Sequence, residues 1–415
     1  MDFLAESDGP GVPMAARERL CLLALAVGLG LAGPAAGSEP AAGEQGVSAI
    51  CLEESGWWVP GARAAQRSDS RRVLGAVVGR DLVLLGEEHD DADHHRWQLQ
   101  VLAGLHALRP KLIIGFEMFP RRVQPVLDRW VAGELSVAEL LEQTEWDEVW
   151  AHPAELYLPL FEFARMNRIP MLALNVDRQL IRKVAASGWA AVSTDQREGV
   201  GNPAPAPAAY REFLSEVHRQ HASLRGGSAD SPGRDPAFDR FVESQLVWDR
   251  AMAEILARSK AAGGRGPLVV GIVGNGHLRF GHGVAHQLRA LGFGSTATLL
   301  PLPVASAECT GLPAQLADAV FAIPAAREPS APPRLGIALE SHRGQVLISS
   351  VGAGSLAESS GLQPGDRIVA VAGRPAADVS TVQGAVRRQP PGTVLPVQIE
   401  RGEVRREVLV RFPVD

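Results

Sequence analysis

Polar and ionisable side chains follow four of the short apolar runs in this sequence. They are Glu88, His89, Glu117, Asn175 and His277. Imidazoles and carboxylates that converge on one point can bind a metal ion or act as a general acid and base. Each residue alone has an ordinary structural explanation, such as a helix cap, an ion pair with a nearby arginine or a loop hydrogen bond. Because four separate runs end this way, we expect one shared pocket.

A glycine-rich turn and one helix add residues to the expected pocket. Gly274 and Gly276 precede His277, and glycine permits tight turns and close approach of the backbone. Gln245 and Asp249 lie one turn apart on the apolar face of a predicted helix. A carboxylate on such a face is costly unless it is paired or serves a ligand. We expect both side chains to line the pocket; hydrogen bonds to backbone groups of nearby loops are the alternative.

The apolar runs that would position these residues have the length of buried strands. They cover residues 81–85, 111–117, 170–175, 268–273 and 295–303. Runs of four to eight apolar residues between helix-length segments are typical of parallel strands in βα units. The sequence therefore predicts an α/β fold, with a mainly parallel sheet and helices on both faces. Ligands of such sheets bind beyond the carboxyl ends of the strands, which is where the polar residues fall.

Helices and loops between these strands are marked by caps and by glycine and proline. Asp93 is expected to cap the first long helix. Its predicted buried stripe is Trp97, Val101, Leu105 and Leu108. Residues 209–224 form a second predicted helix, between loops at 199–209 and 226–236 that are rich in glycine and proline.

Composition and charge narrow the functional class. The chain has 415 residues, which at about 150 residues per domain indicates two or three domains. Hydrophobic residues make up 46% and charged residues 21%, so a chain that is disordered throughout is excluded. The net charge of -6 argues against nucleic acid as a partner, because nucleic-acid-binding domains usually carry a basic stripe.

The N-terminal sequence predicts export. Two arginines precede the uncharged run 20–32, which is followed by small residues, a pattern typical of a secretory signal peptide. We expect a signal peptide over residues 1–37, starting at Met1 or Met14, and a location in the periplasm or in association with the envelope. An uncleaved anchor or a buried helix is the alternative. Cys21 lacks the small residues that precede a lipidated cysteine, so we do not predict a lipoprotein.

The C-terminal region differs in character from the rest of the chain. A proline-rich linker at 325–333 precedes residues 334–413, which read as short strands with one helix near 380–388. The turn at 361–366, Gly-Leu-Gln-Pro-Gly-Asp, leads into an alternating strand. This region resembles a small, β-rich bacterial PDZ domain.

The PDZ resemblance implies a peptide-binding site. Backbone amides of the loop at Leu335–Ile337 would receive the terminal carboxylate of a peptide. The peptide would then add as a strand beside Ile337–Glu340. The residues implied to bind it are Leu335, Gly336, Ile337 and Ala338.

Several motifs of the first region occur in a recognisable order. They are Gly86-Glu-Glu-His-Asp90 with His94-His95, Phe116-Glu-Met-Phe119, Thr144-Glu-Trp-Asp147, Leu172-Ala-Leu-Asn175, Gln245-x-x-Trp-Asp-x-x-Met-Ala253 and Gly274-Asn-Gly-His277. Over roughly residues 56–324 they resemble the ChaN family of haem-binding uptake proteins, which is related to the Tiki, TraB and erythromycin-esterase proteins. The resemblance implies an α/β fold with its site at the strand ends, and handling of haem or iron in the cell envelope. Many relatives are lipoproteins, and this chain departs from them in lacking the lipidation signal.

A haem iron needs an axial His, Tyr, Met or Cys in an apolar pocket. Tyr157 fits the family pattern, although a core tyrosine is the alternative, and Tyr210 and His221 lie on the helix predicted at 209–224. No Cys-x-x-Cys-His motif is present, so any haem is expected to be non-covalent. The expected haem-or-metal site is Glu88, His89, Glu117, His277 and Tyr157. The expected pocket is Asn175, Gln245, Asp249, Gly274 and Gly276.

These observations lead to one favoured function and two rivals. We expect an exported protein that binds haem or an iron species and whose PDZ domain docks the C-terminal peptide of a protein partner; a homodimer is left open. The first alternative is a metal-dependent hydrolase of peptidase or esterase type. In it His89 and His277 bind a divalent metal ion or act as base, while Glu88 or Glu117 activates water. The second alternative is a non-catalytic PDZ adaptor. The expected segments are 1–37 signal peptide, 38–72 N-terminal extension, 73–324 ChaN-like domain, 325–333 linker and 334–413 PDZ domain.

Overall fold

A computed structural model gives the structure of the chain. The described residues are 55–62, 64–224, 235–260, 266–304, 312–324, 333–342 and 344–414. The predicted signal peptide, most of the predicted linker and the side chain of His221 lie outside this description. No helix within the described ranges combines the length and the apolar character needed to cross a bilayer.

The chain divides by its internal contacts into two units. The first consists of Met1–Glu134 and Glu162–Ala325, and the second of Leu135–Phe161 and Ala326–Asp415. The first unit contains the predicted strands, and we call it the α/β unit. The second contains the region predicted as a PDZ domain, together with residues 135–161, which the sequence analysis had placed in the first domain.

The α/β unit is built on a sheet with eight strands in the described residues, in the order β2-β1-β8-β7-β3-β6-β4-β5. The strands are β1 Gly56–Val59, β2 Gln66–Ser68, β3 Leu82–Leu85, β4 Leu112–Pro120, β5 Met171–Asn175, β6 Leu268–Ile272, β7 Thr296–Val304 and β8 Ala319–Pro324. From β8 to β5 every neighbouring pair is parallel, whereas β1 pairs antiparallel with both β2 and β8. The predicted mainly parallel α/β fold is confirmed, and β3 to β7 match the five predicted strands.

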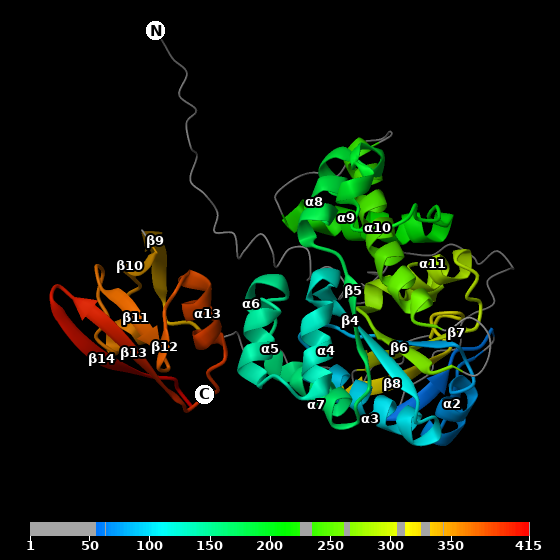
Figure 1. Ribbon diagram of the computed structural model, residues 1–415, viewed down its shortest axis with the longest axis horizontal. Helices are drawn as coiled ribbons and strands as arrows, with labels where there is room; N and C mark the ends of the chain where they lie inside the picture. Colours follow the sequence, from blue (N-terminus) through cyan, green and yellow to red (C-terminus); the bar gives the residue numbers. More distant parts are fainter. Residues whose placement is uncertain are drawn as a thin grey trace, which may run out of the picture. The chain divides into compact units, whose positions relative to one another are not determined.

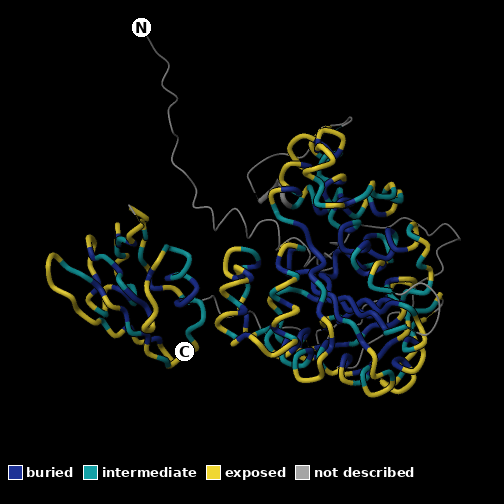
Figure 2. Tube along the Cα trace, in the orientation of Figure 1, coloured by how far each residue is buried: buried dark blue, intermediate teal, exposed yellow. Residues whose placement is uncertain are grey.

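Helices cover both faces of this sheet (Figure 1). They are α2 Ser70–Val77, α3 Ala92–Leu108, α4 Gln124–Ala132, α7 Leu158–Met166, α8 Arg178–Ser187, α9 Ala208–Leu224, α10 Pro236–Arg258 and α11 Val284–Ala290. All four residues of β3 are fully buried, and the strands form the dark centre of the unit in Figure 2. A strand that is apolar at every position needs cover on both sides, which explains why the sequence shows continuous apolar runs here.

The first turn of α3 differs from the sequence prediction. Asp91, not Asp93, is the N-cap, and its carboxylate accepts the N–H of Asp93 at 2.8 Å and that of His94 at 3.3 Å. The predicted stripe also ends one turn early, because Leu108 is 55% exposed at the last position of the helix. The earlier cap places Asp93 and His94 in the first turn of α3.

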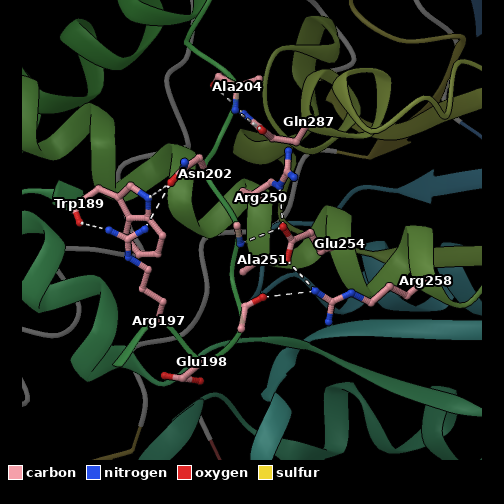
Figure 3. A network of polar contacts seen from close by, with 12 residues as sticks. Trp189, Arg197, Glu198, Asn202, Ala204, Arg250, Ala251, Glu254, Arg258 and Gln287 are labelled. Atoms are coloured by element: carbon pink, nitrogen blue, oxygen red, sulfur yellow. Dashed lines mark hydrogen bonds and ion pairs between the residues drawn. The ribbon is translucent and has the colours of Figure 1, made fainter. Parts of the chain in front are cut away.

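The segment predicted as a loop at 199–209 has no helix or strand before α9, yet its backbone is held by side chains from several elements (Figure 3). Glu254 of α10 accepts the N–H of Gly201 at 3.0 Å. The side-chain amide of Gln287 pairs with both backbone groups of Ala204, at 2.8 and 3.0 Å. We call residues 198–204 the strap. The strap is therefore fixed at several points ahead of α9.

The second unit contains an antiparallel sheet of order β14-β13-β11-β10-β9, with β12 paired to β11. The elements are α5 Val137–Gln143, α6 Trp146–Val149, β9 Ile337–His342, β10 Gln345–Val351, α12 Leu356–Ser359, β11 Arg367–Val371, β12 Arg374–Pro375, α13 Val379–Arg387, β13 Val394–Arg401 and β14 Val404–Arg411. The core of this sheet includes Val346, Ile368, Val397 and Val410. The predicted β-rich region with a single longer helix is confirmed.

Candidate functional site

The carboxyl ends of four adjacent strands, β3, β6, β4 and β5, bring several predicted residues together. The Oε2 atom of Glu117 accepts the N–H of Gly274 at 2.6 Å, and the backbone oxygen of Glu117 accepts the side-chain amide of Asn175 at 2.9 Å. The Nε2 atom of His277 lies 3.8 Å from Oε1 of Glu117. Glu117, Asn175, Gly274 and His277 come from three parts of the sequence. Together with His89, which lies close to Gly274 and Glu117, they form one contiguous cluster that we call the strand-end cluster.

His277 is held in the cluster by a carboxylate behind it. Its Nδ1 atom lies 2.7 Å from Oδ1 of Asp249, and the hydroxyl of Tyr210 donates to Oδ2 of the same carboxylate at 2.9 Å. Burial alone would lower the pKa of His277, but the charge and hydrogen bond of Asp249 outweigh it and raise that pKa. Burial and Asp249 together raise the pKa of Tyr210, so its hydroxyl stays protonated and donates. Nδ1 therefore carries the proton, and Nε2 faces Glu117.

Tyr210 was considered from the sequence only as a haem ligand, and its role beside Asp249 was missed. It lies in the first turn of α9, directly after the strap, and is 1% exposed. The sequence did contain one signal for this role, Asp249 on the apolar face of α10, because a buried carboxylate needs hydrogen-bond donors.

His89 has a similar arrangement with a different carboxylate. Its Nδ1 atom lies 2.8 Å from Oε1 of Glu87, and Gln98 donates to Oε2 of Glu87 at 3.1 Å. Burial opposes ionisation of Glu87, yet the charge of His95 and the hydrogen bond of His89 outweigh it and lower the pKa of Glu87 to about 2. For His89 the effect of burial is outweighed by the hydrogen bond to Glu87 and by the charge of Glu117, which raise its pKa to about 9.

Glu87 is the residue of this motif that sequence reasoning missed. The analysis had chosen Glu88, its neighbour. Glu88 lies at the edge of the cluster, where it accepts from the side-chain amide of Asn275 at 3.0 Å and lies 3.6 Å from Arg279. Burial raises the pKa of Glu88, and the hydrogen bond from Asn275 offsets this only in part. In a run of two glutamates the sequence does not show which one turns inward.

The close packing around position 274 explains why a glycine occurs there. A Cβ atom on Gly274 would lie 2.9 Å from Cε1 of His89 and 3.4 Å from Oε2 of Glu117. The imidazole of His89 and the carboxylate of Glu117 therefore occupy the space that any other residue would need. The backbone approaches both groups closely, as the sequence analysis expected of this turn.

Three predicted site residues are not part of the strand-end cluster. Gln245 is only partly buried, and no hydrogen bond to its side chain occurs within the described residues. Gly276 is buried in the short 3-10 helix Asn275–His277, between two residues of the site. Tyr157 belongs to the second unit, where it is fully buried against the rings of Trp146 and Phe161.

A second imidazole in an apolar setting was also missed from the sequence. His218 of α9 is partly exposed, and its ring lies 5.6 Å from that of Phe238 and 5.3 Å from that of Phe241 on α10. The guanidinium of Arg211 also lies over the Phe238 ring, 5.2 Å from its centroid, and is paired with Asp239. The two helices thus present an imidazole between aromatic rings, with a guanidinium nearby.

The chemistry open to the strand-end cluster follows from these contacts. Each of its two imidazoles is held through Nδ1 by a carboxylate, an arrangement that directs Nε2 and makes it a better base or ligand. Within the described part of the chain, no group of three or more His, Cys, Asp or Glu side chains is arranged to hold a metal ion. The cluster can therefore move protons as it stands, and gives no support to the predicted divalent metal.

The loop of the second unit that was predicted to bind a peptide has a well-fixed backbone. Gly336 has a φ of 75°, and a Cβ there would lie 2.4 Å from Cβ of Ser355. The N–H of Gly352 donates to the oxygen of Gly336 at 2.8 Å, and the N–H of Ala357 donates to that of Leu335 at 2.9 Å. The loop is thus fixed from behind, directly before β9, which is an edge strand of the sheet.

Comparison with known proteins matches both units. A family model described as haem-binding uptake, Tiki superfamily, ChaN matches residues 73–288, and a PDZ domain model matches residues 347–401. A curated relative, Protein RETICULATA-RELATED 5, chloroplastic, of Arabidopsis thaliana, is 22% identical over 232 residues, which are 54% of this chain. The match spans only 31% of that relative.

Two solved structures are also similar. One is titled cofacial heme binding to ChaN of Campylobacter jejuni; it is 16% identical, with a TM-score of 0.47, and the match covers 65% of this chain and 98% of that one. The other is the HtrA3 PDZ domain bound to a phage-derived ligand; it is 26% identical, with a TM-score of 0.17, and the match covers 19% of this chain and 82% of that one.

The match of the first family model covers just over half of the chain, and it includes β3 to β6, α10 and every residue of the strand-end cluster. The second model covers β11, β13 and most of β10 in the C-terminal sheet. The chain therefore belongs to the ChaN family of haem-binding uptake proteins in the Tiki superfamily, and carries a PDZ domain after its α/β unit.

Proposed function

We propose that this chain is an exported protein of the cell envelope that binds haem non-covalently through its α/β unit and docks a partner through its PDZ domain. The observation that carries the haem proposal is the family match, which spans both sets of imidazoles described above. Export is supported by the charge and apolar pattern of the N-terminal sequence. Docking is supported by the loop before β9, which is held by backbone hydrogen bonds and lies beside an edge strand that a peptide could extend.

The donor chemistry of the α/β unit fits haem. Haem is a flat, mostly apolar ring with two anionic propionates, and its iron accepts an imidazole. At the strand ends, His277 lies 5.2 Å from the ring of Trp248 and is oriented by Asp249, so Nε2 would be the ligating atom. On α9, the ring of His218 lies beside two phenylalanine rings, and Arg211, which lies over one of them, carries a charge that could pair with a propionate. Bound haem would supply an iron centre; the protein would supply the ligand, the apolar contacts and the counter-charge.

His277 and His218 differ in how accessible they are to haem, so binding at each site leads to a different prediction. The side chain of His277 is 8% exposed, and Glu117 faces its Nε2 atom. Haem that enters the strand-end cluster must therefore displace Glu117. His218 is partly exposed and needs no such displacement.

A haem titration of the full chain, followed by absorbance, tests the proposal and separates the two sets. We expect a saturable Soret band that is lost in either His277→Ala or His218→Ala and kept in the other. His106→Ala is a matched control, because His106 is also partly exposed and also lies beside a phenylalanine ring, at 5.8 Å. Absence of a saturable band in the folded wild-type chain would overturn the haem proposal.

One observation favours a second candidate, a hydrolase that uses acid–base chemistry. The Asp249–His277 contact at 2.7 Å, with Glu117 facing Nε2, is an arrangement in which an imidazole takes a proton from water or a nucleophile. The test is hydrolysis of a panel of chromogenic esters and peptides by the full chain. We expect His277→Ala and Asp249→Asn to lower any turnover together, while His106→Ala leaves it unchanged. Turnover that is equal in all variants would exclude the cluster as its source.

A further inference from the structure

A row of charged side chains crosses the outer face of the PDZ sheet. The register places Glu340 of β9 opposite Leu347 of β10, Leu347 opposite Arg367 of β11, Arg367 opposite Glu400 of β13, and Glu400 opposite Arg405 of β14. Residues that lie directly opposite share a face of the sheet, where their side chains interact. Glu400 is bound on both sides, by Arg367 and, at 2.7 Å, by Arg405.

Glu340 is the end of this row and has no ionic partner there. Its neighbour across the sheet is Leu347, and no ion pair involving Glu340 occurs in the described part of the chain. It is exposed, and it lies on β9, the edge strand. The other carboxylate of the row, Glu400, has two ion pairs, so among the described residues Glu340 is the acidic position of the row without one.

The position of a bound peptide follows from the proposed docking mode, on which this inference rests. A peptide whose carboxylate meets the loop at Leu335–Ile337 and whose chain continues toward Glu340 runs antiparallel to β9. Its last residue then lies beside Ile337, and each earlier residue lies beside the next residue of β9. The fourth residue from the C-terminus therefore lies opposite Glu340.

The alternation of β9 determines which peptide side chains point where. Ile337 and Leu339 are half-buried and pack on the core, whereas Ala338 and Glu340 are exposed. The last and third-from-last side chains of the peptide consequently face the core side, where apolar residues are favoured. The second- and fourth-from-last face outward, and the fourth continues the charged row.

The geometry points to a PDZ domain that selects partners with a lysine or arginine at the fourth residue from the C-terminus, and Glu340 is the residue that reads this position. A cation there would extend the alternating row by one strand. A glutamate there would be placed directly opposite Glu340 and repelled.

The test is binding of paired C-terminal peptides to the full chain by fluorescence anisotropy. The peptides carry Lys or Glu at the fourth-from-last position and Ala at the second-from-last, while the last and third-from-last positions are varied through Val, Leu, Ile, Ala and Phe. We expect the Lys peptide of each binding pair to bind roughly threefold to tenfold more tightly, because exposed charge pairs are weak and both attraction and repulsion contribute. The preference should shrink as salt rises, because these charges are exposed.

Charge reversal on the protein provides the matched comparison. Glu340→Lys should invert the preference, whereas Glu407→Lys should preserve it, since Glu407 is an exposed glutamate on β14 at the opposite edge of the same sheet. Peptides that bind with no dependence on the fourth-from-last residue would overturn the role of Glu340 and leave peptide docking intact. A chain that binds no peptide of the set would overturn the docking proposal and the inference together.

Discussion

Removal of the Tyr210 hydroxyl is the sharpest test of the buried polar arrangement behind His277. Tyr210→Phe keeps the ring and deletes one donor, which lies 2.9 Å from Oδ2 of Asp249. Both side chains are buried, at 1% and 0% exposed, so water cannot replace the lost donor. Hydrogen bonds to charged groups contribute more than neutral ones, and leaving a buried carboxylate short of a donor adds to the loss. We expect the free energy of unfolding to fall by about 2 kcal/mol.

A matched control separates the effect of the charged acceptor, Asp249, from the effect of losing any buried hydroxyl. Ser244 also lies on α10, is 2% exposed, and donates to the neutral backbone oxygen of Phe241 at 2.7 Å. Ser244→Ala should cost only about 1 kcal/mol, because its acceptor carries no charge. Urea unfolding followed by tryptophan fluorescence measures both variants, and Trp248, 5.2 Å from His277, reports on this region. The reasoning is refuted if Tyr210→Phe loses no more stability than Ser244→Ala.

Three further predictions concern the pH dependence and the two glycine positions. The raised pKa of His89, about 9 against an ordinary 6.5, contributes stability that is complete below pH 6.5 and lost as pH rises through 9. This amounts to about 3 kcal/mol. The lowered pKa of Glu87, about 2 against 4.5, contributes stability that is complete above pH 4.5 and lost as pH falls toward 2. The free energy of unfolding, measured from pH 3 to 10, should therefore be highest between pH 4.5 and 6.5 and fall on both sides. His89→Asn should remove most of the fall above pH 6.5; an unchanged fall there would contradict this reasoning. Gly274→Ala should destabilise the α/β unit by about 1 to 3 kcal/mol in urea unfolding, because its Cβ needs the space of the His89 ring; a neutral effect would show that this ring is not held. Gly336→Ala should lower the melting temperature of the PDZ unit and weaken peptide binding in the same titrations, since φ is 75° and the new Cβ meets Ser355 at 2.4 Å; wild-type affinity would show that the loop does not contact the carboxylate.

The sequence allowed the strands to be predicted well, because a parallel strand covered on both sides is a continuous apolar run. β3 and β6 are buried at every position and match their predictions to within one residue. The two-stranded addition β1–β2 and the strand β8 could not be predicted in the same way. β2 is largely exposed, and its place depends on pairing with β1, which depends in turn on β8.

Only the site residues that follow the ends of the strands could be predicted from the sequence. Glu117, Asn175 and His277 come together because the strands that carry them are neighbours. Glu87 and Tyr210 could not be chosen from the sequence, since their role depends on the direction of a side chain in a turn and on the packing of a helix. His218 was missed for a related reason: the two phenylalanines beside it come from α10 and meet it only in the folded helix pair.

The strap has a consequence for how this chain can be altered. From its sequence alone, the strap resembles a flexible linker rich in glycine and proline. Tags, protease sites and new chain ends are commonly introduced in such linkers. Here the backbone amides of Gly201 and Ala204 are taken by Glu254 and Gln287, and the oxygen of Glu198 is taken by Arg121 at 2.7 Å. A protease needs several residues of extended backbone in its own active site, so it must first free these groups. The strap should therefore resist digestion as a folded helix does, and it is a poor place to open or lengthen the chain.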